Sequence, residues 1–237
     1  MKYNITGTVM QTVNIELKKG ESVISQRGGM TWFSDNIFMD TTVRGGLVEA
    51  VKRKFTGESL FMTKFTCTKG TGIISFGADF PGKIIPLKIK KGKDYIAQKR
   101  AFLCAEPGVN LKIEFRKKFG RGFFGGEGFV LQRISGKGLA FVNIEGEILQ
   151  CTLKKGQKLV IDTGYIAMYE PTVDYDIERI RGTRNILFGG EGIFFATLTG
   201  PGKVWLQSMT SARLAGRLAG FFTSGKRGIL STLLGGR

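Results

Sequence analysis

The chain has 237 residues, of which 42% are hydrophobic, so it can bury a full core and is neither disordered nor fibrous. Its 36 Lys and Arg against 19 Asp and Glu give a net charge of +17, which favours nucleic acid, an anionic membrane face or acidic proteins as partners over a basic surface with no single partner. With no histidine, the commonest hydrolytic constellations and histidine-metal sites are excluded.

Alternating polar and apolar residues predict half-buried strands along most of the chain. Examples are NIEL at 14–17, SLFMTKFTC at 59–67, KLVID at 158–162 and KVWLQ at 203–207. The 35 glycines suit many short strands and tight turns. Residues 45–55 and 173–185 carry the only helix-like pattern of the body and predict short helical connectors.

Three short patterns recur in the same cyclic order and predict three homologous units. KKG occurs at 18–20, 90–92 and 154–156, where we expect a hairpin turn with a type I bulge and a glycine of positive φ. A Gly-x-Gly follows at 70–72, 136–138 and 200–202. The start ITGTVMQTVNIELKKG is similar to the second unit and predicts that the first strand closes the third unit.

The third pattern is a Gly-Glu turn, which we expect to be architectural. Its residues are Gly57 and Glu58, Gly126 and Glu127, and Gly190 and Glu191. A cyclase-like magnesium hairpin is the weaker interpretation, because the second acidic residue is absent and the turn occurs three times. Asp174, Asp176 and Glu178 alternate along one segment and are expected on a solvated strand face rather than in a catalytic or metal site.

Three cysteines, Cys67, Cys104 and Cys151, are an odd number without any CxxC spacing. They are expected to be free thiols, which favours a reducing cytoplasm. The N-terminus has no apolar run typical of a signal peptide, and no segment approaches 18 uncharged apolar residues. These features predict a cytoplasmic protein that associates with a membrane only at its surface.

Two basic regions are candidate contact sites. In the tail, residues 210–237, one helical face combines apolar and basic residues and is suited either to an anionic membrane interface or to packing on the body or a neighbouring subunit. The candidate membrane contacts are Arg213, Leu214, Arg217, Leu218, Phe221, Phe222, Lys226 and Arg227. The candidate nucleic-acid contacts are Arg116, Lys117, Lys118 and Arg121.

Several stretches resemble the AIM24 family, in order along nearly all of Tyr3 to Ser208. They are YNITG, GGMTWFSDNIFMDT, FTGESLFMTKF, PGKIIPLKIKKG with AFLCAEPGV, GYIAMYEPTVDYDIE and LFGGEGIFFATLTGPGKVWLQS. The resemblance implies an all-β, TRAP-like fold of the double-stranded β-helix kind and a tendency to form homo-oligomers. Members are mostly uncharacterised and a fungal relative is tied to mitochondrial inner-membrane organisation, so no catalytic or ligand residue carries over.

The sequence thus predicts a single closed β domain of three repeats over residues 1–209, followed by the basic amphipathic tail. We expect a non-enzymatic oligomeric scaffold at an anionic membrane face, with no cofactor, metal or identified small-molecule ligand. The alternative is an RNA- or DNA-binding protein that uses basic surface loops. The weakest interpretation is a small-ligand module or an enzyme of the double-stranded β-helix type, whose metal site usually requires histidines.

Overall fold

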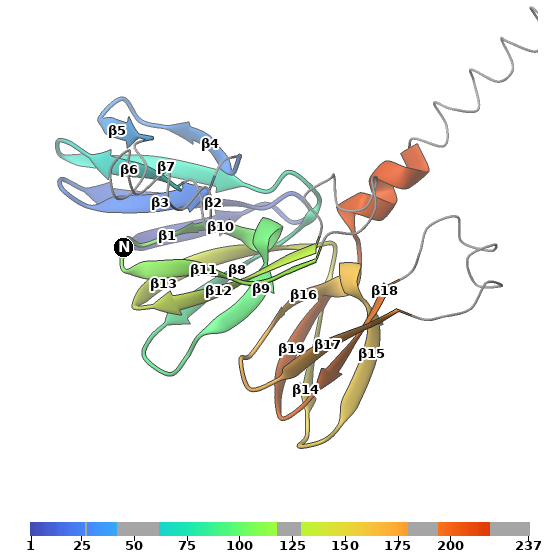
Figure 1. The fold of residues 1–237 in the computed structure, drawn as a ribbon. Helices are drawn as coiled ribbons and strands as arrows, with labels where there is room; N and C mark the ends of the chain where they lie inside the picture. The colour runs from blue at the N-terminus through green and yellow to red at the C-terminus, as the bar shows by residue number, and fades with distance from the viewer. Residues whose placement is uncertain (27, 42–61, 118–128, 180–193, 219–237) are drawn as a thin grey trace, which may run out of the picture.

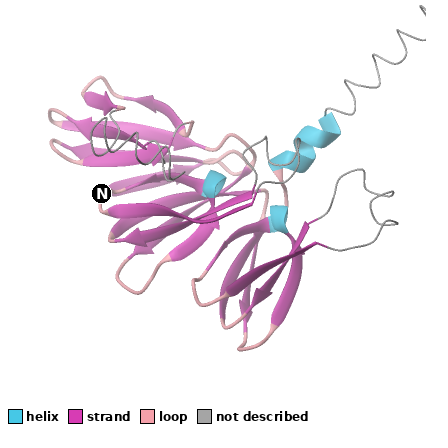
Figure 2. Ribbon diagram, in the orientation of Figure 1, coloured by secondary structure: helices cyan, strands magenta, loops and turns pink. Residues whose placement is uncertain are grey.

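The structure is a computed structural model that describes residues 1–26, 28–41, 62–117, 129–179 and 194–218. These residues form mostly β-strands, arranged as three lobes in a row (Figures 1 and 2). We name them the N-terminal lobe (residues 1–77), the middle lobe (82–145) and the C-terminal lobe (148–207).

The strands run in chain order through the lobes. The N-terminal lobe holds β1 (Lys2–Thr6), β2 (Thr12–Lys18), β3 (Ser22–Gln26), β4 (Met30–Phe33), β5 (Ile37–Asp40), β6 (Met62–Cys67) and β7 (Thr71–Gly77). The middle lobe holds β8 (Gly82–Ile89), β9 (Tyr95–Gln98), β10 (Phe102–Ala105), β11 (Val109–Lys117), β12 (Phe129–Gly136) and β13 (Gly138–Glu145). The C-terminal lobe holds β14 (Ile148–Leu153), β15 (Lys158–Asp162), β16 (Ile166–Tyr169), β17 (Asp174–Arg179), β18 (Phe194–Thr199) and β19 (Gly202–Gln207).

Helices are few in the described part of the chain. Short 3-10 turns occupy Lys99–Ala101 and Thr163–Tyr165, and an α-helix spans residues 211–218. Residues 174–179, expected within a helical connector, instead form the strand β17. The correction has a simple cause, because Tyr175 and Ile177 are half-buried while Asp174 and Asp176 are exposed, a period of two that suits the ladder with β18. The other expected connector, 45–55, lies outside the described residues.

The same antiparallel pairing occurs in each lobe. In each lobe, the strand before the KKG turn pairs with the last strand: β2 with β7, β8 with β13, and β14 with β19. The pairs β3–β6, β9–β12 and β15–β18 follow. The remaining pairs within lobes are β4–β7, β10–β13 and β16–β19, and β5–β6, β11–β12 and β17–β18.

Two further pairings join the lobes into larger sheets. β3 pairs with β10 and β9 pairs with β16, which produces six-stranded sheets in the orders β5-β6-β3-β10-β13-β8 and β11-β12-β9-β16-β19-β14. A four-stranded sheet, β1-β2-β7-β4, and a three-stranded sheet, β15-β18-β17, complete the described part. β1 therefore pairs with β2 in its own lobe, and the expected closure of the last unit by the first strand is not seen among these pairings.

Each lobe has its own hydrophobic core between its two sheets. Alternate residues of β2 supply Val13, Ile15 and Leu17 to the core of the N-terminal lobe. The other two cores gather around Ile134 and Ala140 in the middle lobe and around Leu131 and Leu198 toward the C-terminal lobe. Cys67 and Cys104 are buried free thiols and Cys151 is a half-buried one.

The KKG segments are tight turns, but they differ from the expected hairpins. Gly20, Gly92 and Gly156 have φ of 84°, 76° and 76°, which confirms the positive φ. In each turn the N–H of the residue after the glycine donates to the carbonyl three residues back, for example Glu21 to Lys18 at 2.8 Å. A glycine of φ near +80° at the third position is the type II pattern. The flanking strands belong to different sheets, so each turn carries the chain from one sheet to the other.

Candidate anion-binding face

The lysine turns lie beside the Gly-x-Gly turns of the same lobe. In the N-terminal lobe, the N–H of Lys19 donates to the carbonyl of Gly70 (2.9 Å), and in the C-terminal lobe the N–H of Gly156 donates to the carbonyl of Gly200 (3.1 Å). In the middle lobe, Ile89 at the end of β8 faces Gly138 in the β8–β13 ladder. One end of each lobe thus brings together two turns that both carry lysine.

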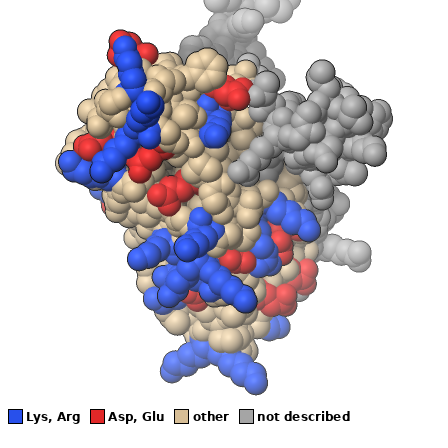
Figure 3. Space-filling model, turned by 90° about the vertical axis from the view of Figure 1, so that its left-hand side faces the viewer, with Lys and Arg blue, Asp and Glu red and all other residues tan. Residues whose placement is uncertain are grey.

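The lysines of these paired turns form what we call the lysine row. All are exposed, and none forms an ion pair with another described residue. Figure 3 looks at this side, where Lys and Arg side chains gather at the top, in the middle and at the bottom. The members are Lys18, Lys19 and Lys69; Lys88, Lys90, Lys91, Lys93 and Lys137; and Lys154, Lys155, Lys158 and Lys203.

Acidic side chains near the row are engaged by backbone donors. A carboxylate oxygen of Glu21 accepts the N–H of Lys18 at 2.8 Å. Glu106 accepts the N–H of Leu139 at 2.7 Å, and Glu170 accepts the N–H of Lys203 at 2.9 Å. These carboxylates hold the turns in shape, and the lysine ammonium groups stay directed to solvent.

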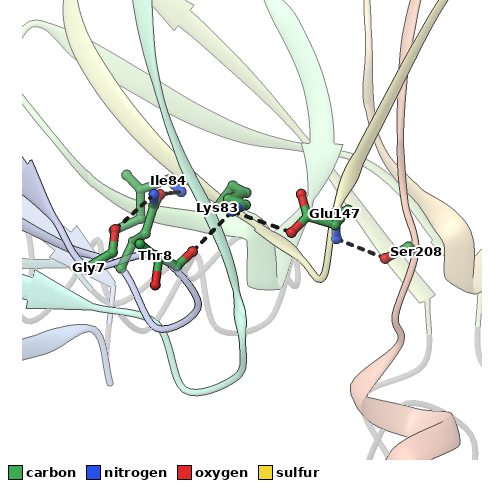
Figure 4. A network of polar contacts seen from close by, with 7 residues as sticks. Gly7, Thr8, Lys83, Ile84, Glu147 and Ser208 are labelled. Carbon is green, nitrogen blue, oxygen red and sulfur yellow. Dashed lines mark hydrogen bonds and ion pairs between the residues drawn. The ribbon is translucent and has the colours of Figure 1, made fainter.

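A lysine elsewhere shows the contrast. Lys83 is an ion-pair partner of Glu147 (3.3 Å) and donates to the carbonyl of Thr8 (3.0 Å), as Figure 4 shows. The N–H of Glu147 donates to Ser208 Oγ (2.8 Å). This network ties the N-terminal lobe and the middle lobe to the two residues that flank the C-terminal lobe, so Lys83 has a structural role that the lysine row lacks.

The helix at 211–218 is fixed to the body at its start. Thr210 is buried and its Oγ1 accepts the N–H of Arg213 (3.2 Å), the geometry of a helix N-cap. The N–H of Ser211 donates to a carboxylate oxygen of Glu145. The guanidinium of Arg213 binds Asp162 Oδ2 at 2.7 Å and lies over the Tyr165 ring, 5.1 Å from its centroid.

The structure describes only some of the residues predicted as contacts. Of the tail set, Arg213 is engaged with the body, Leu214 is half-buried, and Arg217 and Leu218 are exposed. The backbone of Arg116 and Lys117 lies in β11. The remaining predicted residues lie outside the described part: Lys118, Arg121, Phe221, Phe222, Lys226, Arg227 and the three Gly-Glu pairs at Gly57, Glu58, Gly126, Glu127, Gly190 and Glu191.

The pattern that sequence reasoning used only for architecture, KKG, is the one that supplies the exposed charge. Its threefold recurrence was the available signal, because three equivalent turns of one fold are expected at equivalent places. The sequence could not show that the three lobes are arranged so that all three KKG turns lie on the same side of the molecule.

The titratable groups with shifted pKa values are structural. Arg133 donates to both carboxylate oxygens of Glu114, at 2.7 and 3.0 Å, and this hydrogen bonding lowers the pKa of Glu114. Burial raises the pKa of Tyr169 and of Tyr175, whose rings stack 5.9 Å apart. Burial also raises the pKa of the Cys104 thiol.

Among the described residues, no helix has the length and apolar character needed to cross a membrane. The family model described as mitochondrial biogenesis AIM24 matches residues 3–209. An uncharacterized protein of Streptococcus pyogenes serotype M6 is 31% identical over 214 residues, which cover 87% of this chain and 84% of that protein. A crystal structure of a Streptococcus pyogenes protein superimposes with a TM-score of 0.76 at 28% identity, covering 93% of this chain and 99% of the other.

Proposed function

The chain belongs to the AIM24 family, and we propose that it is a non-enzymatic oligomeric β scaffold that lies against an anionic membrane surface. The lysine row carries this proposal, because exposed lysines without ionic partners among the described residues recur on all three lobes. Each Lys or Arg close to an anionic lipid surface contributes about 1 kcal/mol of attraction. A row of such turns therefore supports peripheral binding.

The proposal includes an origin in three repeats. Support comes from the common pairing scheme, in which the strand before each KKG turn pairs with the last strand of its lobe, and from the KKG turn at the same place in each scheme. A repeated unit multiplies one weak lysine turn into a multivalent surface, and an oligomer multiplies it again.

The tail adds to this contact in the proposal. Arg213 holds the start of the helix at 211–218 against the C-terminal lobe, so residues beyond Leu218 begin from a fixed point on the body. Residues 219–237 contain Lys226, Arg227 and Arg237 and no acidic residue. They supply further positive charge for the same anionic surface.

Nucleic acid is the second candidate, because lysines also bind a phosphate backbone. The turns of the lysine row expose lysine, glycine and threonine rather than aromatic side chains. Single-strand binders add aromatic stacking platforms to a basic groove. The lysine row therefore favours a surface of phosphate headgroups over splayed bases.

The test is co-sedimentation with phosphatidylserine vesicles at moderate salt. We compare the wild type, the triple variant Lys19→Gln/Lys91→Gln/Lys155→Gln, and a control with Lys→Arg at the same three positions. Loss of three charges at about 1 kcal/mol each lowers the affinity about 100-fold, and the arginine control retains it.

Two further arms separate the alternatives. A chain that ends at Leu218 keeps the contacts of Ser211 and Arg213 and measures the contribution of the tail alone. Excess RNA leaves membrane binding intact if lipid is the target. Equal vesicle binding by the glutamine and arginine variants contradicts the role of the lysine row, and displacement of all forms by RNA assigns the surface to nucleic acid.

A further inference from the structure

Two strand pairings connect neighbouring lobes, and we call each of them a joint. Both are built in the same way. At the first, β10 pairs antiparallel with β3, with Cys104 opposite Ser25 and Ala105 opposite Ile24. At the second, β16 pairs antiparallel with β9. Here Met168 lies opposite Ala97, and Tyr169 lies opposite Ile96.

The strand β4 has the place in its lobe that β10 and β16 have in theirs. Each pairs with the last strand of its own lobe, and each ladder shifts register after its first residue. In β4 the residues after the shift are Trp32 and Phe33, and in β16 they are Met168 and Tyr169. Trp32 and Phe33 thus stand at the positions that form the internal joints.

The strand β15 has the place of β3 and β9. All three follow a KKG turn and pair with the fifth strand of their unit. Counted from the turn glycine, Val160 and Ile161 stand where Ile96 and Ala97 stand in β9. β15 therefore corresponds to the first strand of a joint, as β4 corresponds to the second. We call β4 and β15 the two half-joints.

Both half-joints lack a partner strand among the described residues. β4 ends the four-stranded sheet and β15 ends the three-stranded sheet. All four residues of β10 and of β16 are buried, whereas Trp32 in β4 is 51% exposed. Ile96 in β9 is buried, whereas Val160 is 61% exposed. An exposed apolar edge strand with free N–H and C=O groups is a template for pairing with another chain.

We propose that β15 of one copy of this protein pairs antiparallel with β4 of a second copy, in the register of the internal joints. Trp32 then lies opposite Ile161 of the neighbouring copy, and Phe33 lies opposite Val160. The inference rests on the oligomer of the proposed function and names the strands that form it. The two surfaces differ, so the contact is head-to-tail and produces a ring or a filament.

The assembly also extends the lysine row. Within the chain, one strand of each joint, β3 or β9, follows a lysine turn, and Figure 3 shows Lys and Arg side chains along one side of the molecule. A joint of the same kind between copies continues that side from one molecule to the next. Membrane avidity then rises with the number of copies.

The test mixes two variants, each of which disrupts one of the two edge strands. Analytical ultracentrifugation measures the mass of each variant alone and of the mixture. Trp32→Lys breaks β4 and leaves β15 intact, and Val160→Lys does the reverse. Each variant alone sediments as the 26.0 kDa monomer, while the wild type sediments as larger species. An equimolar mixture forms dimers and nothing larger, because only one productive pair of edges remains.

Leu149→Lys is the matched control. Leu149 is 63% exposed on β14, which ends another sheet, and neither internal joint uses the equivalent edge. This variant retains the mass of the wild type. Circular dichroism establishes that each variant folds, as expected for substitutions of exposed side chains.

Three outcomes overturn the inference: a wild type that is monomeric at tens of micromolar, a broken-edge variant that keeps the mass of the wild type, or a mixture that stays monomeric. Vesicle binding by the monomeric variants is measured separately. Weak residual binding supports the lysine row without the joint, and complete absence of binding by both wild type and variants rejects the proposed function but not the assembly.

Discussion

The strands β16 and β4 pair in the same way within their lobes, but β16 is buried and β4 is partly exposed to solvent. β16, Ile166–Tyr169, is buried at every residue because β9 covers its outer edge. β4, Met30–Phe33, has Thr31 and Trp32 exposed because no described strand covers its outer edge. Both are apolar in sequence, so the neighbouring strand decides which of them is core.

The largest expected effect comes from placing the same residue in both strands. Met168→Lys puts an ammonium group inside the joint, where it has no carboxylate partner, and costs about 3–5 kcal/mol of unfolding free energy. Trp32→Lys occupies the equivalent position at the open edge and costs less than about 1 kcal/mol. Urea unfolding measures both, in a Val160→Lys background so that neither protein assembles.

A similar cost for the two substitutions contradicts the comparison, because it means that β4 is as enclosed as β16. Conversely, a Met168→Lys protein as stable as its parent shows that the β9–β16 joint opens without loss of the fold.

The second effect concerns the residue that ends the joint strand. In β9 this is Gln98, whose Nε2 donates to the carbonyls of Ile166, Thr163 and Gly164 across the joint. Gln98→Ala leaves these acceptors without that donor and costs about 1–3 kcal/mol. In β15 the equivalent residue is Asp162, which caps Gly164 and binds Arg213 instead.

Asp162→Ala is therefore the matched variant, with a cost of about 0.5–1.5 kcal/mol for a cap and a surface ion pair. Thermal unfolding of the two proteins ranks them. If Asp162→Ala proves the more damaging, the helix at 211–218 stabilises the C-terminal lobe more than a joint stabilises the middle lobe.

A third difference between the lobes is aromatic. Tyr175 of the C-terminal lobe stacks with the ring of Tyr169 and with the ring of Phe129 from the middle lobe, and its Oη is buried with no hydrogen-bond partner in the described structure. Because burial raises the pKa of Tyr175 in the folded protein, its contribution to stability is present below the unfolded pKa of about 10 and is lost at higher pH.

Tyr175→Phe removes a hydroxyl that has no partner, so stability at pH 7 stays within about 1 kcal/mol of the wild type or rises. Between pH 10 and pH 12 the variant loses less stability than the wild type. In the wild type, Tyr175 ionises more readily when the protein is unfolded, which favours unfolding, and the variant lacks this phenol. Urea midpoints across this range are the measurement. Identical alkaline slopes mean that Tyr175 reaches water in the folded state.

The sequence was sufficient for the strands and turns because period two and glycine spacing are local signals. It predicted the KKG turns and their positive φ, and of its two expectations for Asp174 and Asp176 the exposed strand face was right and the helical connector was wrong. It could not show that KKG joins two different sheets, since a turn looks the same whichever strands it connects. The joint residues Ala97 and Met168 are far apart in the chain and have no local signature, so the open edges at β4 and β15 came only from the structure.

The smallest effect tests an ion pair that, among the described residues, occurs in the middle lobe and has no counterpart at the equivalent positions of the other two lobes. Arg133 lies opposite Ile96 and forms a bidentate ion pair with Glu114. In the other two lobes the equivalent positions, opposite Ile24 and Val160, hold Lys64 and Thr197. Glu114→Gln costs about 0.5–1 kcal/mol at pH 7, because both side chains are partly exposed and screened by solvent. The pKa of Glu114 is lowered in the folded protein, so the pair stabilises above the unfolded pKa of about 4.3 and the contribution disappears as pH falls through the folded value. The unfolding midpoints of wild type and variant therefore differ at pH 7 and converge near pH 2. A gap that persists in acid means that the glutamate acts through packing, and the middle lobe then owes its stability to its two joints rather than to this ion pair.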